Sequence, residues 1–261
     1  MKAFALLLSI LSIDLGGTYL LLNRISETES LEKAREEETT GKGFAVVELF
    51  TSEGCSSCPP ADRLLAEIYR NSPQEEVFPL AFHVDYWNRL GWTDPYSDAA
   101  FSTRQRQYAQ KLNDRVYTPM MIFNGQEVAV GSRTDDVWQE LRHALKQKAT
   151  VPIDLHHLRM EGREVTFIFS APAAQSEHVI NLALVQRNVT VEVKAGENRN
   201  RILEHDHVVR DFASYSLGGH QTGQQQFTLP EAEGEYILVA YVQNGPYGPV
   251  VGATRLELAE L

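Results

Sequence analysis

The sequence predicts an α/β domain followed by an all-β, sandwich-like domain. Residues 44–149 follow the order strand, helix, strand, helix, hairpin, helix, which is typical of an α/β layer with one antiparallel edge. After Thr150 the pattern changes to short apolar or alternating runs separated by turn residues, which is typical of a β-sandwich. The length of 261 residues fits two domains of modest size, which we place at 44–149 and 150–261.

The first strand and helix of the α/β region have the clearest signals. Residues 44–50 form a near-continuous apolar run, which suits a strand buried on both faces of a sheet. Pro59 and Pro60 then open a helix, because a proline in a first turn removes an N–H that would be unpaired anyway. Apolar residues recur at helical spacing over 61–68.

The other elements are marked by apolar runs, turn dipeptides and helix caps. The hairpin turns at Asn124–Gly125, and Thr134 caps the last helix of the region. The α/β region is expected to continue with a strand at 77–84, an aromatic-rich loop at 85–95, a helix at about 97–112, a hairpin at 120–130 and a helix from 134. The β region is expected to hold strands at 153–158, 165–169, 179–185, 189–193, 226–229, 236–242 and 250–258.

Composition excludes one class of function. The chain has 35 acidic residues against 24 Lys and Arg, a net charge of −11. A nucleic-acid binder usually presents a basic face, so no nucleic-acid partner is expected.

The N-terminus carries a targeting signal. Residues 3–22 form a mostly apolar run in which Asp14 is the only charge, a length that suits a signal peptide or a membrane anchor. We place this segment at 1–25 and a polar tether at 26–43. The basic residues after the run outnumber the single lysine before it, which by the positive-inside rule favours a cytoplasmic body. The cysteine pair favours redox chemistry, and we give this more weight than the distribution of basic residues. We therefore expect a periplasmic or secreted protein, free or anchored to the inner membrane.

The two cysteines of the chain, Cys55 and Cys58, are three positions apart. A disulfide that served stability would close a longer loop, because short loops constrain the unfolded chain least. A zinc site needs about four ligands, and the sequence has no second cysteine pair to complete one. Redox chemistry fits best, with Cys55 as the nucleophile and Cys58 as the resolving thiol. Cys55 is expected to be the more exposed, because it precedes the helix.

The position of the pair favours reactivity. Unpaired N–H groups and the dipole at a helix start favour the thiolate, which is the reactive form of cysteine. Glu53 opposes the thiolate, and no Lys or Arg follows before Arg63. The sequence therefore favours a reductant or isomerase over a strong oxidant.

Several segments of the sequence resemble a known group of proteins. Residues 44–131 resemble the thioredoxin superfamily, and VELFTSEGCSSCPPAD, from Val47 to Asp62, is similar to the opening of a bacterial secreted family catalogued as a domain of unknown function. Segments at 83–87, 91–92, 117–119, 196–198 and 208–210 are similar to that family as well. The resemblance implies a thioredoxin-like fold for 44–149.

The resemblance also implies site residues. Thr118–Pro119 matches the superfamily's cis-proline site, which faces the cysteines and binds the substrate backbone. Thioredoxins carry a buried carboxylate six residues before the first cysteine, which assists proton transfer to the second. Leu49 occupies that position here, and we expect its neighbour Glu48 to handle the proton, although strand alternation directs Glu48 to the other face unless a bulge intervenes. Gly54 replaces the usual tryptophan, so substrate contacts must differ.

Two further groups are weaker candidates. Asp85 and Trp87, with Trp92, are expected to rim a substrate groove; packing beneath a lid is the alternative. His205–Asp206–His207 would present two histidines on one side of a strand, but without a further ligand we predict no metal and no cofactor.

The sequence thus predicts an exported thiol–disulfide oxidoreductase that acts on protein or small thiol and disulfide substrates, with the β region serving partner binding or dimerisation. Two alternatives stay open. The thiols could hold Cu(I), a soft ion suited to thiolates, or the chain could be a non-catalytic scaffold that keeps the fold.

Overall fold

A computed structural model describes residues 43–73, 76–231 and 234–258. The predicted signal peptide or anchor, and the tether up to residue 42, lie outside these ranges. No helix within them is long and apolar enough to cross a membrane.

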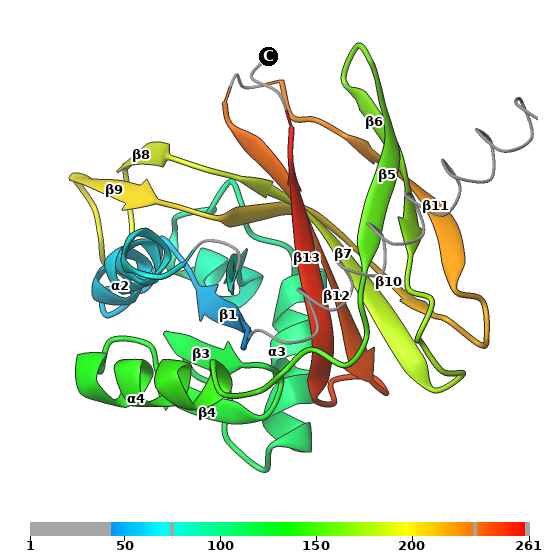
Figure 1. The fold of residues 1–261 in the computed structure, drawn as a ribbon. Helices are drawn as coiled ribbons and strands as arrows, with labels where there is room; N and C mark the ends of the chain where they lie inside the picture. Colours follow the sequence, from blue (N-terminus) through cyan, green and yellow to red (C-terminus); the bar gives the residue numbers. More distant parts are fainter. Residues whose placement is uncertain (1–42, 74–75, 232–233, 259–261) are drawn as a thin grey trace, which may run out of the picture. The chain divides into compact units, whose positions relative to one another are not determined.

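The protein is mixed α/β and is built on one eight-stranded sheet with the strand order β13-β12-β7-β10-β2-β1-β3-β4 (Figure 1). In chain order its elements are β1 (Ala45–Thr51), α2 (Pro59–Asn71), β2 (Val77–His83), the 3₁₀ helix η1 (Asp85–Leu90), α3 (Ala99–Lys111), β3 (Met120–Phe123), β4 (Glu127–Val130), α4 (Thr134–Ala144), β5 (Asp154–Glu161), β6 (Glu164–Ser170), β7 (His178–Gln186), β8 (Val189–Val193), β9 (Arg201–His205), β10 (Val208–Ser216), β11 (Thr222–Thr228), β12 (Tyr236–Asn244) and β13 (Val250–Glu257).

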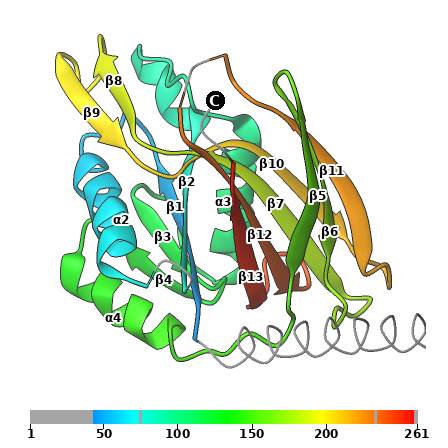
Figure 2. The same cartoon turned by 45° about the horizontal axis from the view of Figure 1, so that its top comes forward.

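Strand β1 is buried on both faces, as its apolar run predicts. Leu49 and its alternate neighbours pack on α2 and α4, and Phe50 and its alternate neighbours pack toward α3. Strand β1 is parallel to β2 and antiparallel to β3. The helices therefore cover both faces of this part of the sheet, and the β1–α2 connection lies at one end of it (Figure 2).

The predicted division into two domains at 149/150 is wrong. Strand β10, which the sequence analysis did not predict, pairs in parallel with β2 through Val208 and Ala81, and Ala81 N donates to His207 O at 2.8 Å. The large sheet is thus continuous across the predicted boundary, and the described residues from 43 onward form one compact unit.

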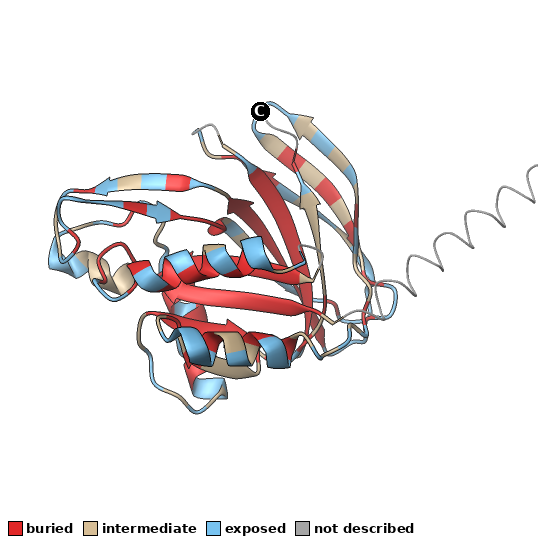
Figure 3. Cartoon of the chain, turned by 60° about the vertical axis from the view of Figure 1, so that its left-hand side comes forward, coloured by how far each residue is buried: buried red, intermediate tan, exposed pale blue. Residues whose placement is uncertain are grey.

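The sandwich-like packing is present inside this unit. The three-stranded sheet β11-β6-β5 packs its apolar side, including Phe167 and Phe227, against residues of β7 and β12 such as Leu182 and Leu238. Figure 3 shows the difference in burial: the central strands are buried along their length, whereas β6 alternates between buried and partly exposed residues. Strands β8 and β9 form a separate hairpin, whose second strand contacts α2.

Candidate functional site

Cys55 and Cys58 form a disulfide at the start of α2, with their Cα atoms 5.4 Å apart. Strand β1 ends at Thr51, and Pro59 opens the helix as predicted. The backbone of Cys58 is already helical, and its carbonyl accepts hydrogen bonds from Ala61 N at 2.8 Å and Asp62 N at 3.1 Å. Cys58 therefore belongs to the first helical turn, and Cys55 precedes it.

The prediction that Cys55 is the more exposed cysteine is wrong for this state of the protein. Both cysteines are fully buried, and only Ser56 and Ser57 between them are exposed. The sulfur atoms are therefore accessible from outside only after part of their cover moves.

The loop between β8 and β9 holds the cysteine loop in place. Asn198 is fully buried, and its Nδ2 donates to the carbonyl oxygens of Glu53 at 2.8 Å and Cys55 at 2.9 Å. Ser56 N donates to Glu197 Oε2 at 3.1 Å, and the hydrogen bonds from Ser56 lower the pKa of Glu197. The sequence analysis noted this segment only for its resemblance and assigned it no role.

Trp87 joins the cysteine loop to Thr118. Its Nε1 donates to Thr118 Oγ1 at 2.8 Å, and a Cβ atom at Gly54 would lie 3.0 Å from the Cβ of Trp87. Glycine at position 54 therefore makes room for Trp87 beside Cys55. The peptide bond between Thr118 and Pro119 is cis, as predicted.

Pro119 lies close to the first turn of α2. A Cβ atom at Gly131 would meet the Cβ of Ala61 at 3.1 Å and the Cβ of Pro119 at 3.3 Å. Gly131 N also donates to Pro119 O at 2.9 Å. The structure thus brings Trp87, Thr118 and Pro119 to the end of α2 that carries the cysteines.

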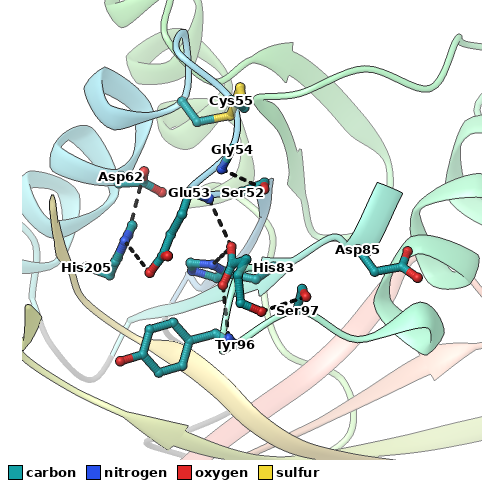
Figure 4. A network of polar contacts seen from close by, with 12 residues as sticks. Ser52, Glu53, Gly54, Cys55, Asp62, His83, Asp85, Tyr96, Ser97 and His205 are labelled. Carbon is teal, nitrogen blue, oxygen red and sulfur yellow. Dashed lines mark hydrogen bonds and ion pairs between the residues drawn. A yellow bond between two sulfur atoms is a disulfide. The ribbon is translucent and has the colours of Figure 1, made fainter. Parts of the chain in front are cut away.

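Asp85 is not part of this group. Its carboxylate accepts a hydrogen bond from Ser102 Oγ of α3 at 2.5 Å, and its N–H donates to the same oxygen at 3.0 Å. Figure 4 shows Asp85 apart from the residues beneath Cys55. Its contacts are those of a residue that anchors η1 to α3.

Glu48 does not lie beside the cysteines either. It faces α3, where Arg104 Nε donates to its Oε2 at 2.6 Å and Tyr108 Oη donates to its Oε1 at 2.6 Å. Leu49, the next residue, faces α2 instead. Without a bulge in β1, strand alternation places Glu48 on the opposite side of the sheet from the α2 helix, and its carboxylate is bound in a buried ion pair. The prediction that Glu48 handles the proton is therefore not supported by its position.

A buried group of acids and histidines occupies the α2 side instead. Its members are fully or almost fully buried, and we call them the acid–histidine cluster: Glu53, Asp62, His83, Asp94 and His205. They come from the cysteine loop, α2, β2, the segment after η1 and β9.

Hydrogen bonds order one half of this cluster (Figure 4). Asp94 Oδ2 accepts from Glu53 N at 2.9 Å and lies 2.8 Å from His83 Nδ1. Burial alone would lower the pKa of His83, but the charge of Asp94 and the hydrogen bond to it raise that pKa overall. Burial works to raise the pKa of Asp94, and the pairing with His83 outweighs it, so the pKa is lowered.

The other half is held by longer contacts. His205 Nε2 lies 3.6 Å from Glu53 Oε1, and His205 Nδ1 lies 3.7 Å from Asp62 Oδ2. Trp92 Nε1 donates to the other oxygen of Glu53 at 2.6 Å, so Trp92 packs into the site. Burial raises the pKa of Asp62, although the charge of His205 opposes this shift.

The two histidines of the His205–Asp206–His207 segment do not act as a pair. Strand β9 ends at His205, and His207 adopts a left-handed backbone conformation, φ 56°, so strand alternation does not apply to it. His207 packs its ring 4.3 Å from the ring of Tyr69. Across the described ranges, no group of three or more His, Cys, Asp or Glu side chains is placed to hold a metal ion.

Comparison with known proteins adds a family and one related structure. The model of a family described as "Protein of unknown function (DUF1223)" matches residues 46–243. A crystal structure of a protein from Agrobacterium tumefaciens, solved as a structural genomics target, is similar with a TM-score of 0.60 and 28% identity over 81% of this chain and 93% of that one. A GH3 β-glucosidase from Bifidobacterium adolescentis matches with a TM-score of 0.22 and 12% identity over 42% of this chain and 17% of its own, a similarity too low to support an argument. No curated protein matches the chain.

Proposed function

Because the chain belongs to the DUF1223 family of proteins of unknown function, we propose its function from the site: it is a thiol–disulfide oxidoreductase that acts through Cys55 and Cys58. The observation that carries the proposal is the place of the two cysteines. They are joined at the first turn of α2. Trp87 of η1 lies beside Gly54 in the cysteine loop and donates a hydrogen bond to Thr118, which precedes β3. Unpaired N–H groups at such a helix start stabilise a thiolate.

The proposed reaction is a two-electron exchange. In the reducing direction the Cys55 thiolate attacks one sulfur of a substrate disulfide, and the other substrate sulfur leaves as a thiolate. The Cys58 thiol then loses its proton and attacks Cys55 Sγ, which forms the Cys55–Cys58 disulfide and releases the second substrate thiolate. The substrate is reduced and the protein is oxidised by the same two electrons. Thr118 and Pro119 would contact the substrate backbone beside the mixed disulfide.

A thioredoxin-like arrangement of residues 44–149 belongs to this proposal. Its support is the strand order β2-β1-β3-β4 with β1 parallel to β2, and helices on both faces of these strands. In this arrangement the strands after residue 150 extend the β2 edge.

We also propose that the protein works outside the cytoplasm, in the periplasm or in secreted form. A disulfide persists in oxidising compartments, and an apolar run followed by polar residues precedes the described chain. A reporter that is active only after export, fused behind residue 258, tests this location.

Catalysed reduction of insulin by dithiothreitol tests the activity. The parent protein should accelerate the reduction, whereas Cys55→Ser and Cys58→Ser should each bring it down to the uncatalysed rate. Glu67→Gln, a change at an exposed position of the same helix, is the control and should keep the activity. If the parent protein gives no acceleration, the scaffold alternative is favoured.

A further inference from the structure

A groove of about 430 Å³ lies between α2 and the β8–β9 hairpin. Ala66 and Glu67 of α2 form one side, and Val189 and Glu204 of the hairpin form the other. Asp62 and His205 line the groove as well, although both are almost fully buried. The groove therefore connects the surface with two members of the acid–histidine cluster.

The polar atoms at this end of the groove are unusual because they lack hydrogen bonds. Within the described part of the chain, neither carboxylate oxygen of Asp62 and neither ring nitrogen of His205 has a partner in hydrogen-bond geometry, although the Thr51 hydroxyl is near enough to Asp62 to act against the rise of its pKa. Buried polar atoms are normally paired, since an unpaired one loses its interaction with water and gains nothing in return. Such exceptions need an explanation, and a role in proton transfer at the inner wall of the groove would provide one.

Asp62 is also placed next to the resolving cysteine. It follows Cys58 by four residues in one continuous helical turn, in which Asp62 N donates to Cys58 O at 3.1 Å. Side chains at this spacing share a helix face, with Cβ atoms about 5–6 Å apart. A helical side chain also leans toward the N-terminus, which here is the side of Cys58.

The neighbouring groups leave Asp62 and His205 available for proton exchange. Asp94 is bound to His83 and to Glu53 N, and Glu53 accepts a hydrogen bond from Trp92. The contacts of His205, drawn in Figure 4, run from Asp62 to Glu53. Charged and titratable groups from several elements face the pair: Glu53 from the cysteine loop, His83 from β2, Asp94 and Tyr96 from the segment after η1, Arg63, Glu67 and Arg70 from α2, and Glu204 and Asp206 from the hairpin side.

We propose that Asp62 and His205 form a proton path between the Cys58 thiol and water in the groove. The inference rests on the proposed oxidoreductase function. When a mixed disulfide on Cys55 is resolved, the proton of the Cys58 thiol passes to the Asp62 carboxylate, and the Cys58 sulfur forms a bond to Cys55 Sγ. The substrate sulfur leaves with the electron pair of the broken bond, and the proton continues through His205 to water. In the reverse reaction the proton moves inward and is taken up by the departing Cys58 thiolate.

The burial of Asp62 fits this role. Burial raises its pKa above the ordinary value, which makes its carboxylate a better proton acceptor than an exposed aspartate. The cost of burying this carboxylate is unfavourable for stability at neutral pH. We therefore expect Asp62→Asn to be at least as stable to urea as the parent protein at pH 7, whereas replacing a residue with a purely structural role would destabilise the fold.

Stopped-flow reaction of the reduced protein with 5,5′-dithiobis(2-nitrobenzoate) separates the two steps. Attack by Cys55 releases the first thionitrobenzoate, and resolution by Cys58 releases the second. Asp62→Asn should leave the first phase unchanged, slow the second by about 100-fold, and flatten its dependence on pH. His205→Gln should also slow only the second phase. Glu67→Gln, on the same helix and the same groove, is the matched control and should change neither phase.

A rescue experiment tests the groove itself. In Asp62→Ala, added formate should restore the second phase, because it reaches the vacated position through the groove and accepts the proton. A second phase that is unchanged in Asp62→Asn, or a slow phase in Asp62→Ala that formate does not restore, would overturn the proton path while the proposed function stands. If the parent protein releases only one thionitrobenzoate, the proposed function fails, and the proton path fails with it.

Discussion

At the scale of single residues, the burial and contacts of Glu48 give its carboxylate a structural role. Glu48 is paired with Arg104, whose guanidinium also donates to the hydroxyls of Tyr108 and Tyr241 and lies over the faces of several aromatic rings. Glu48, Tyr108 and Tyr241, the polar partners of Arg104 named here, are all buried. Such a pair is stabilising only while it is complete, because removal of one member leaves the other charge unpaired in the core.

We therefore expect Arg104→Met to lower the free energy of unfolding by about 3–5 kcal/mol. The rate at which Cys55 reacts in the folded protein should not change, because Arg104 lies on the α3 side of the sheet. Urea denaturation and the first stopped-flow phase measure the two effects. Arg106→Met, at an exposed position of the same helix, should have little effect on either. A stable variant with altered cysteine kinetics would instead place Glu48 and Arg104 in the reaction.

The prediction of Glu48 as the proton-handling residue shows which residues of the site can be identified from the sequence and which cannot. Asp62 could have been identified as a neighbour of Cys58, because a spacing of four residues in a predicted helix puts both on one face. His83, Asp94 and His205 could not be found in this way, because the chain returns through η1 to place Asp94 against His83, and the packing of β9 on α2 places His205 against Asp62. No local pattern in the sequence encodes these long-range contacts.

At the scale of elements, the β8–β9 loop controls the shape of the cysteine loop. The two hydrogen bonds from Asn198 satisfy buried carbonyl groups on both sides of Gly54. Without them the carbonyl of Glu53 loses the hydrogen bond from Asn198, at a cost of about 1–3 kcal/mol for a group left unsatisfied, whereas the carbonyl of Cys55 keeps the hydrogen bond from Cys58 N at 3.2 Å. The loop should then open more often.

For this reason Asn198→Ala should increase the rate at which dithiothreitol reduces the Cys55–Cys58 disulfide, since the fully buried sulfur atoms become accessible more often. Amide hydrogen exchange at residues 53–57 should accelerate in parallel. Arg199→Ala changes an exposed neighbour and serves as the control. Slower reduction, or unchanged exchange in the loop, would show that Asn198 does not hold the cover in place.

The elements themselves were predictable to different degrees. The apolar runs and caps of residues 44–149 identified every strand and α-helix there, because these elements are buried against a continuous sheet; the 3₁₀ helix η1 lies where a loop was expected. The missed strands β9 and β10 have mixed polarity: only Val208 and Val209 of β10 are buried, and the rest of that strand is partly or fully exposed. A strand that is buried at one end has no period-2 pattern to detect.

At the scale of the whole molecule, the continuous sheet makes the two predicted domains one folding unit. The core around Phe50 and Phe82 includes Val185, Val209 and Ile237 from the later part of the chain. Residues 43–149 alone would expose this apolar surface and the free edge of β2.

We expect the protein to unfold in a single transition. All three tryptophans, Trp87, Trp92 and Trp138, lie before residue 150, so their fluorescence reports on the first part of the chain. Strands β7 and β12 lie after it and are buried, so pulsed amide hydrogen exchange at these strands, measured at each urea concentration, reports on the second part. The two signals should give the same urea midpoint, and two separate midpoints would restore the two-domain description.

Covalent trapping on Cys55 tests the central claim most directly. In Cys58→Ser the first attack stays intact and resolution is blocked, so a substrate with a disulfide should accumulate as a mixed disulfide on Cys55. Mass spectrometry of the variant after reaction with insulin or oxidised glutathione should show this adduct at Cys55, and Cys55→Ser should not form a comparable adduct on Cys58. No adduct on Cys55, or equal labelling of both cysteines in their single variants, would contradict the oxidoreductase assignment.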